Sequence, residues 1–258
     1  MKDLINYTLQ LADNSLILGH RNSEWTGHGP ILEQDIAISN IALDLIGQAR
    51  NLYQYAATLI NQSSNQPNKL ATEDTLAYLR NENEFKNCLL VEQTNGDWAK
   101  TILRQFFFSA YQFYLYQHLQ NSNDETIAAI AEKSLKEVTY HLRWSSEWVI
   151  RLGDGTEESH ERMIKAIDDL WKYTDEFFNA TSYELLAANE RYGTDILSIK
   201  NDWLKKVKDI FDEATLSIPA EQDQQIKWFG KEGKHSEHLG YILAEMQFLQ
   251  RTYPNSVW

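Results

Sequence analysis

The sequence is poor in cysteine and in basic residues, and each shortage excludes a class of protein. A single cysteine, Cys88, can form neither an internal disulfide nor a cysteine-ligated metal cluster, which fits a reducing compartment. Lys and Arg number 24 against 37 Asp and Glu. The formal net charge of −13 therefore argues against a nucleic-acid partner, because binding the phosphate backbone needs clustered cations.

Long hydrophobic runs are also missing. No apolar run reaches the roughly 18 residues that a membrane span requires. Asp3 and Asp13 interrupt the apolar run at the N-terminus, which is not typical of a signal peptide. We therefore expect a cytoplasmic protein without a membrane partner.

Proline is scarce and strand-like alternation is absent. Each of the four prolines lies beside polar or glycine-containing sequence, which indicates a boundary between helices. The intervening segments have helical periodicity, and they predict about eight helices joined by short loops. The expected fold is an all-α, ferritin-like helical bundle with additional helices. We predict one domain over residues 1–258, with a C-terminal helix and tail at 236–258.

The stretch from Ile31 to Ile60 predicts a central helix that is apolar on nearly all sides, and such a helix is expected to be buried. A narrow polar stripe interrupts this apolar surface, and we expect it on the inner face. Carboxylates on the inner face of a bundle helix are typical of di-iron proteins. The stripe consists of Glu33, Asn40, Asp44, Gln48 and Asn51.

A predicted helix from Glu125 to Leu152 places Glu137 and His141 in its core-facing stripe, four residues apart. Together with Asp44, these two residues could supply half of a metal site. The interpretation we favour is a buried hydrogen-bonded network. The di-iron template needs a Glu from each of two helices and a Glu-x-x-His motif from each of two others. This sequence lacks that set in the predicted core.

Two Glu-x-x-His strings do occur, but in poor contexts. Residues 157–160 lie in the predicted first turn of a helix, where acidic residues serve as caps. Residues 232–235 lie in a glycine-containing loop, and His235 and His238 indicate a polar helix entry. We therefore assign no catalytic, cofactor-binding or metal-ligating residue. Asp44, Glu137 and His141 are retained for the alternative that the chain holds its own metal.

Four stretches resemble the PaaC-type subunits of bacterial phenylacetyl-CoA epoxidases, which are multicomponent monooxygenases of aerobic phenylacetate breakdown. The resemblance covers nearly the whole chain, from about Leu11 to Trp258, and its longest specific run is Glu137–Met163. The four stretches are residues 15–50, 74–106, 135–163 (LKEVTYHLRWSSEWVIRLGDGTEESHERM) and 235–258 (HSEHLGYILAEMQFLQRTYPNSVW).

This resemblance implies a ferritin-like fold and a structural, non-catalytic role. It implies partnership with a ferritin-like subunit that carries the di-iron centre, and with other epoxidase subunits. A separate reductase would supply flavin and iron–sulfur groups, and this chain would bind no cofactor.

Two alternatives stay open. One is a divergent di-iron oxygenase or ferroxidase that uses Asp44, Glu137 and His141. The other is a homodimer whose role is unrelated to oxygenation.

Overall fold

A computed structural model describes residues 1–64, 70–219, 229–254 and 256. Every regular element in these ranges is helical, which confirms the all-α prediction. None of the described helices is long and apolar enough to cross a membrane. The chain divides into two compact units, Met1–Gln93 with Trp228–Trp258 (unit 1) and Thr94–Lys227 (unit 2). The single domain over residues 1–258 stays a prediction.

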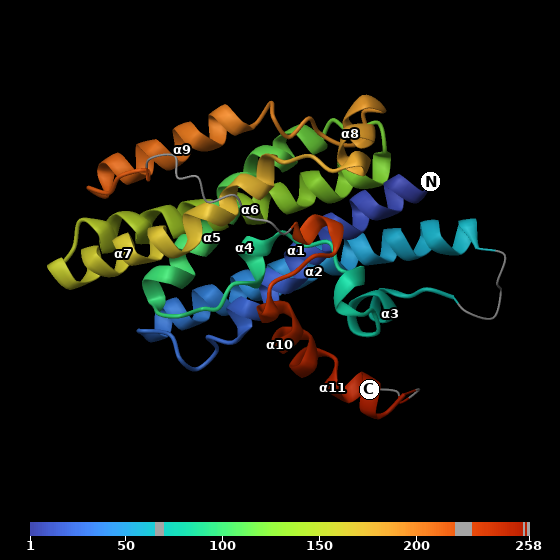
Figure 1. Ribbon diagram of the computed structural model, residues 1–258, viewed down its shortest axis with the longest axis horizontal. Helices are drawn as coiled ribbons and strands as arrows, with labels where there is room; N and C mark the ends of the chain where they lie inside the picture. The colour runs from blue at the N-terminus through green and yellow to red at the C-terminus, as the bar shows by residue number, and fades with distance from the viewer. Residues whose placement is uncertain (65–69, 220–228, 255, 257–258) are drawn as a thin grey trace. The chain divides into compact units, whose positions relative to one another are not determined.

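Unit 1 is built on two long helices that pack along one another, α1 and α2 (Figure 1). The shorter helices of this unit come partly from the N-terminal segment, after α2, and partly from the C-terminal segment of the chain. The turn before α2 is held by Asp35, whose Oδ1 accepts the N–H groups of Gly27 (2.9 Å) and Gly29 (3.1 Å). The elements are α1 (Lys2–Ser23), α2 (Leu32–Ser63), α3 (Glu73–Tyr78), η1 (Glu82–Glu84), α4 (Leu89–Glu92), η3 (Gly230–Glu232), α10 (Glu237–Met246) and α11 (Phe248–Thr252).

The prediction that α2 is buried on nearly all sides is wrong. Ile36 and Leu43 are 51% and 65% exposed, while Ile38, Ile41 and Leu45 are buried. The polar stripe is not an inner face either, because Glu33 and Asn40 are exposed and only Gln48 is fully buried. The helical wheel identified apolar residues correctly, but an apolar residue need not face the core of its own chain.

Unit 2 contains the second pair of long helices, α5 and α6, which also pack together. Helical periodicity predicts a buried helix from Trp98 to Leu119, and α5 has these bounds and largely buried aromatic residues. Asp97 and Asp124 cap the two helices by accepting backbone N–H groups of their first turns. The elements are α5 (Trp98–Leu119), α6 (Glu125–Gly153), α7 (Glu157–Leu170), η2 (Trp171–Phe178), α8 (Ser182–Asn189) and α9 (Lys200–Glu213).

Two predicted helices are broken in the structure. Helical periodicity after a cap at Thr72 predicts a helix to about Glu92 with a break near Asn81, and the structure forms α3, η1 and α4 there. The last predicted helix is divided into α10 and α11 at Gln247. The polar composition of residues 61–70 and 215–234 predicts loops, and parts of these ranges and of the tail 254–258 lie outside the described residues.

Candidate functional site

The three residues reserved for a metal site are divided between the two units. Asp44 is half-buried on α2 in unit 1. Glu137 is half-buried and His141 fully buried on α6 in unit 2. Each of the three makes further interactions within the protein. The described ranges contain no group of three or more His, Cys, Asp or Glu residues that could hold a metal ion.

The first Glu-x-x-His string has the capping role predicted for it. Thr156 precedes α7, and its hydroxyl accepts the N–H of Ser159 at 3.2 Å. Glu157 is exposed in the first turn, where its negative charge interacts favourably with the positive end of the helix dipole. His160 Nδ1 lies 2.6 Å from the carbonyl oxygen of Gly153, so this ring joins the end of α6 to the start of α7.

The second string is different, because the predicted polar helix entry is wrong for His235. The side chains of His235 and Glu92 are both fully buried, and Nδ1 of the ring lies 2.9 Å from Glu92 Oε2. The other ring nitrogen lies 3.0 Å from the carbonyl oxygen of Phe85. A carboxylate and a carbonyl only accept hydrogen bonds, so this geometry favours the imidazolium form, in which both ring nitrogens donate.

Electrostatics agrees with this geometry. Burial by itself would lower the pKa of His235, but the hydrogen bond and charge of Glu92 raise the pKa above its ordinary value. Glu92 accepts two more hydrogen bonds, from Ser236 N–H (2.7 Å) and from Asn87 Nδ2 (2.9 Å). Arg21 reaches the backbone carbonyl of Glu92 through Nε (3.1 Å) and Nη2 (2.9 Å).

Two glycines allow the C-terminal segment to reach this cluster. A Cβ at Gly230 would lie 2.2 Å from the carbonyl oxygen of Asn87. Gly233 has φ +79, and a Cβ there would lie 2.4 Å from the carbonyl oxygen of Asn83. Only glycine permits these two approaches without a shift of the backbone. They bring residues 230–236 against the segment before α4, where His235 meets Glu92.

A second buried ionic cluster in unit 1 has Asp13 of α1 at its centre. Arg80 donates to both carboxylate oxygens, at 3.1 Å for Nη1···Oδ2 and more closely for Nη2···Oδ1. Tyr53 of α2 donates its hydroxyl to Oδ1 at 2.5 Å, and the N–H of Lys86 donates to Oδ2 at 2.7 Å. The Arg80 guanidinium also lies over the ring of Phe85, 4.2 Å from its centroid.

The charges in this second cluster stabilise one another. Burial first, and then the charge of Asp13, raise the pKa of Tyr53 well above its ordinary value, so the phenol stays protonated. Burial would lower the pKa of Arg80, but Asp13 more than compensates and raises it. Arg80 also donates to the carbonyls of Leu76 (2.5 Å) and Glu84 (2.9 Å). This contact fixes the chain where the predicted long helix breaks.

The donor sets of these clusters do not fit a di-iron centre. Every oxygen of the Asp13 and Glu92 carboxylates already accepts hydrogen bonds from protein groups. A metal would have to displace those donors and would lie beside the cationic Arg80 or His235. Both nitrogens of His235 face hydrogen-bond acceptors of the protein, whereas a ligating imidazole must offer the metal a free nitrogen lone pair. The arrangement is that of structural ion pairs.

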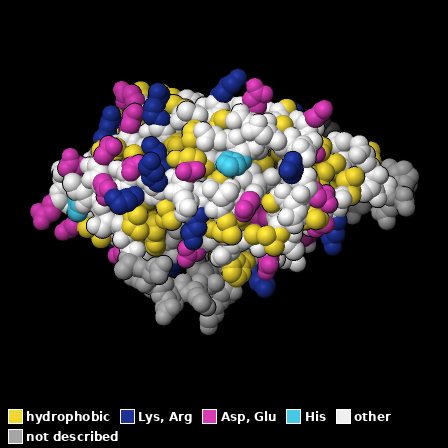
Figure 2. Space-filling model, turned by 90° about the horizontal axis from the view of Figure 1, so that it is seen from above, with side chains coloured by type: hydrophobic (Ala, Val, Ile, Leu, Met, Phe, Trp, Pro, Cys, Tyr) yellow, Lys and Arg dark blue, Asp and Glu magenta, His cyan; other side chains and the backbone are white. Residues whose placement is uncertain are grey.

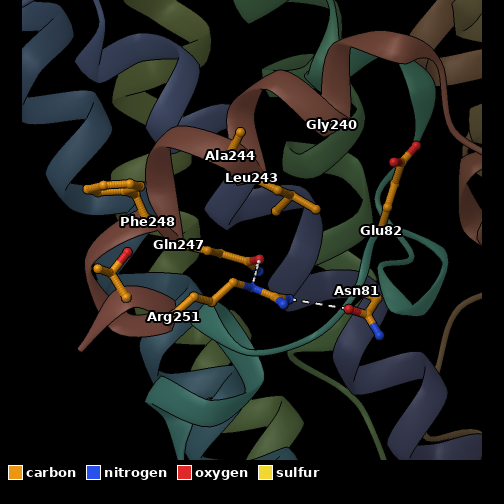
Figure 3. A pocket seen from close by; sticks show the side chains of 9 residues that line it. Asn81, Glu82, Gly240, Leu243, Ala244, Gln247, Phe248 and Arg251 are labelled. Atoms are coloured by element: carbon orange, nitrogen blue, oxygen red, sulfur yellow. Dashed lines mark hydrogen bonds between the residues drawn. The ribbon is translucent and has the colours of Figure 1, made fainter. Parts of the chain in front are cut away.

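One pocket in unit 1 has a volume of about 330 Å³ and lies beside α10, α11 and residues 81–82 (Figure 3). Two of its polar side chains, Arg251 and Gln247, already make hydrogen bonds within the protein. Arg251 Nε donates to Gln247 Oε1 at 2.8 Å (Figure 3). Arg251 Nη2 donates to the carbonyl of Arg80 at 2.9 Å. Gln247 Nε2 donates to the same carbonyl at 3.0 Å. These residues tie the last helices to the segment that follows α3.

Sequence reasoning missed both ionic clusters. Asp13 was noted only as a charge within an apolar run, and Glu92 only as a helix end. That context was the available signal, because a charge flanked by apolar residues on a buried helix face needs a partner. The sequence did not indicate that the partners are 67 residues away for Asp13 and 143 residues away for Glu92.

Comparison with known proteins places these features in a family. Residues 1–258 match the family described as phenylacetic acid catabolic protein. The chain is also 45% identical over 258 residues to one of the subunits, designated C, of the 1,2-phenylacetyl-CoA epoxidase of Escherichia coli (strain K12), with both chains fully covered.

Proposed function

This chain belongs to the phenylacetic acid catabolic protein family, and we propose that it is a structural, non-catalytic subunit of a phenylacetyl-CoA epoxidase. The full-length similarity to a subunit of such an epoxidase supports the assignment to the complex. The hydrogen bonds that the carboxylates of Asp13 and Glu92 accept within unit 1 support the structural role. Asp13 and Glu92 each accept hydrogen bonds from distant segments on both carboxylate oxygens, so these carboxylates connect the fold.

The remaining parts of the proposal concern the partners. The chain pairs with a ferritin-like subunit that holds the di-iron centre and oxidises the aromatic ring of phenylacetyl-CoA. A reductase with flavin and iron–sulfur groups supplies electrons, and the complex works in the cytoplasm. The resemblance in the sequence motivates each of these statements. The chain's own contribution is a rigid helical surface, and a structural subunit does not itself touch the reacting atoms.

The experiment compares the isolated chain with the assembled complex. The purified chain should contain no stoichiometric iron and should not turn over phenylacetyl-CoA with reductase. Addition of the di-iron subunit should give a stable complex with activity. Two irons bound by the isolated chain, together with turnover, would overturn the proposal in favour of the metal-binding alternative with Asp44, Glu137 and His141.

A second measurement separates the two alternatives without activity. A metal bound only by the native state raises the melting temperature of the chain. We therefore expect the same melting curve with ferrous iron and with chelator. A rise with iron that disappears in an Asp44→Asn, His141→Gln variant would favour the metal-binding alternative.

A further inference from the structure

The C-terminal segment of unit 1, residues 229–253, is attached to the rest of the unit by few contacts, and we call it the strap. It contains η3, α10 and α11 (Figure 1). Helix α10 packs against α1, η1 and α4. Three apolar side chains of α10 are buried, Leu239, Ile242 and Leu243, whereas α11 contains no buried residue. With so little apolar burial, the attachment of the strap depends strongly on its polar contacts.

The first attachment is the buried pair of His235 and Glu92. Acidic, basic and histidine side chains usually reach the surface, as they do on the face shown in Figure 2. The two side chains of this pair are instead completely shielded from solvent. The ring of His235 lies between a carboxylate oxygen of Glu92 (2.9 Å) and the carbonyl oxygen of Phe85 (3.0 Å). The next backbone N–H of the strap, that of Ser236, donates to the other oxygen of Glu92 at 2.7 Å.

The second attachment lies at the other end of the strap and depends on no histidine or carboxylate. Arg251 and Gln247 both donate to the carbonyl oxygen of Arg80, at 2.9 and 3.0 Å. Arg251 Nη2 also lies 3.4 Å from Asn81 Oδ1 (Figure 3). A guanidinium stays charged and an amide stays neutral near neutral pH. The strap therefore has one attachment that can titrate and one that cannot.

The charges around His235 come from α1, from α4 and from the strap. Burial lowers the pKa of His235, but the hydrogen bond and charge of Glu92, together with the more distant charge of Asp13, raise the pKa above its ordinary value. Arg21 donates to the backbone carbonyl of Glu92, and Arg80 is paired with Asp13. Both guanidinium groups stay charged. The other charged or titratable side chains at this end of the strap are Lys86, Lys231, Glu232, Lys234, Glu237 and His238.

Two of the neighbouring residues are histidines, and both must be separated from His235. Burial lowers the pKa of His20 on α1 to about 4, so that ring is neutral throughout a test above pH 6. His238 is half-buried on α10, three residues after His235. It belongs to the same strap but has no contact with Glu92 like that of His235, so it offers a matched control.

From this geometry we propose that the strap is a pH-controlled element of unit 1, which is held closed while His235 is an imidazolium between Glu92 and Phe85 and opens when the ring loses its proton. A neutral ring donates from one nitrogen only, so its other nitrogen faces an acceptor without a proton between them. The buried carboxylate of Glu92 also loses its cation. Opening hydrates both groups, while the rest of unit 1 stays folded.

Opening uncovers two residues that report it. Gly230 lies against the backbone of Asn87 and Leu89, on either side of the single cysteine, Cys88, which is 2% exposed. Lys231 of the strap is 1% exposed. A thiol reagent reacts with Cys88, and trypsin cleaves after Lys231, when the strap leaves this position.

The test measures the rate of Cys88 labelling in the full-length protein between pH 6 and 9. Each rate is divided by that of a peptide comprising residues 84–92 at the same pH, which removes the change in thiolate fraction. The ratio should be constant below about pH 6.5, because His235 is then protonated in both states. Above this pH the ratio should rise by up to tenfold per pH unit until the ring is neutral in the closed state. Trypsin cleavage after Lys231 should follow the same profile.

Three variants assign the dependence. His235→Gln should raise the labelling ratio at pH 6 at least tenfold and remove its dependence on pH. His238→Gln should keep the wild-type profile. Arg251→Met weakens the second attachment, so it should raise the ratio by a similar factor at every pH and leave the shape of the profile unchanged.

Three results would overturn the proposal. One is a wild-type ratio that does not change with pH, a result that remains decisive even where His235→Gln fails to fold. Another is a His238→Gln variant without the pH dependence, which would assign the effect to that residue. The third is a labelling ratio that rises with urea as steeply as global unfolding does, because Cys88 would then be exposed by loss of the whole fold and not by a local opening.

Discussion

The two units hold their irregular segments in different ways. In unit 1, buried charges join the segments, and the carboxylates of Asp13 and Glu92 bind partners far away in the sequence. In unit 2, aromatic rings have this role. Trp203 of α9 lies within 6.0 Å, centroid to centroid, of Phe107 on α5 and of Phe177 and Phe178 on η2.

The difference has a physical consequence. Ring contacts are weakly directional and add up, so each substitution in unit 2 removes a share of stability that depends on the volume lost. A buried ion pair is directional, and breaking one partner leaves the other charge without compensation. The stability of unit 1 should therefore depend on pH and on the pairing of its buried charges.

The largest effect is expected from Trp203→Ala. Trp203 is fully buried, and its Nε1 donates to the carbonyl of Phe107 at 3.0 Å. The substitution should lower the free energy of unfolding by about 4 kcal/mol, measured by urea denaturation, because it removes a large core side chain. The conservative control Trp203→Phe should lose less than half of that. A loss below about 1 kcal/mol for Trp203→Ala would contradict the aromatic account of unit 2.

The next largest effect is expected from Arg80→Met. This change leaves Asp13 buried without its cation and should cost about 3 kcal/mol in the free energy of unfolding. The double variant Asp13→Leu, Arg80→Met should recover most of the loss, since replacing both partners by apolar groups is often neutral. In unit 2, by contrast, truncation of a second buried aromatic side chain should lower the free energy of unfolding further, in addition to the loss from the first. A double variant in unit 1 that is less stable than Arg80→Met would remove the contrast between the units.

A third prediction uses the pH dependence of unit 1. Because the folded pKa of His235 is raised, its stabilisation is complete below the ordinary pKa of about 6.5 and is lost as pH rises through the folded value. Hydrogen exchange of the α4 and α10 amides should therefore accelerate in mildly alkaline buffer beyond the intrinsic rate. His235→Gln should abolish this dependence, and the exposed His28→Gln control should retain it. Equal acceleration in the α5 and α6 amides would show that the effect is not local.

His20, also in unit 1, should give the opposite dependence of stability on pH. Burial lowers its pKa to about 4, so the folded state holds the neutral ring. Stability should fall as pH decreases from about 6.5 towards 4, because the unfolded chain binds the proton more readily. His20→Gln should flatten the acidic side of the pH profile of unfolding and leave the alkaline side unchanged. The expected slope is at most about 1.4 kcal/mol per pH unit. An acidic side that His20→Gln leaves as steep as in the wild type would assign that dependence to other groups.

The smallest effect is expected from Gly47→Ala. The added methyl group meets no atom of the chain, so the isolated protein should gain about 0.5–1 kcal/mol from the better helix propensity of alanine. The gain should appear as a higher urea midpoint with an unchanged slope. If Gly47→Ala instead destabilised the isolated chain, the folded chain itself would require glycine at this position.

The sequence by itself determined the helical class, most helix starts and the family. Helical periodicity and caps such as Asp97 and Asp124 are local features, and local features are readable without a structure. The incomplete Glu-x-x-His pattern was also local, and the absence of a metal site in this chain stays a prediction.

Only the tertiary structure decided which charges are buried together and which apolar residues are left outside. The pairs Asp13–Arg80 and Glu92–His235 join segments that lie far apart in the chain, and no periodic pattern encodes such a match. Ile36 and Leu43 have the same side-chain chemistry as the buried Ile38 and Leu45. Burial of an apolar residue depends on what packs against each face of its helix, and that is a property of the assembled fold.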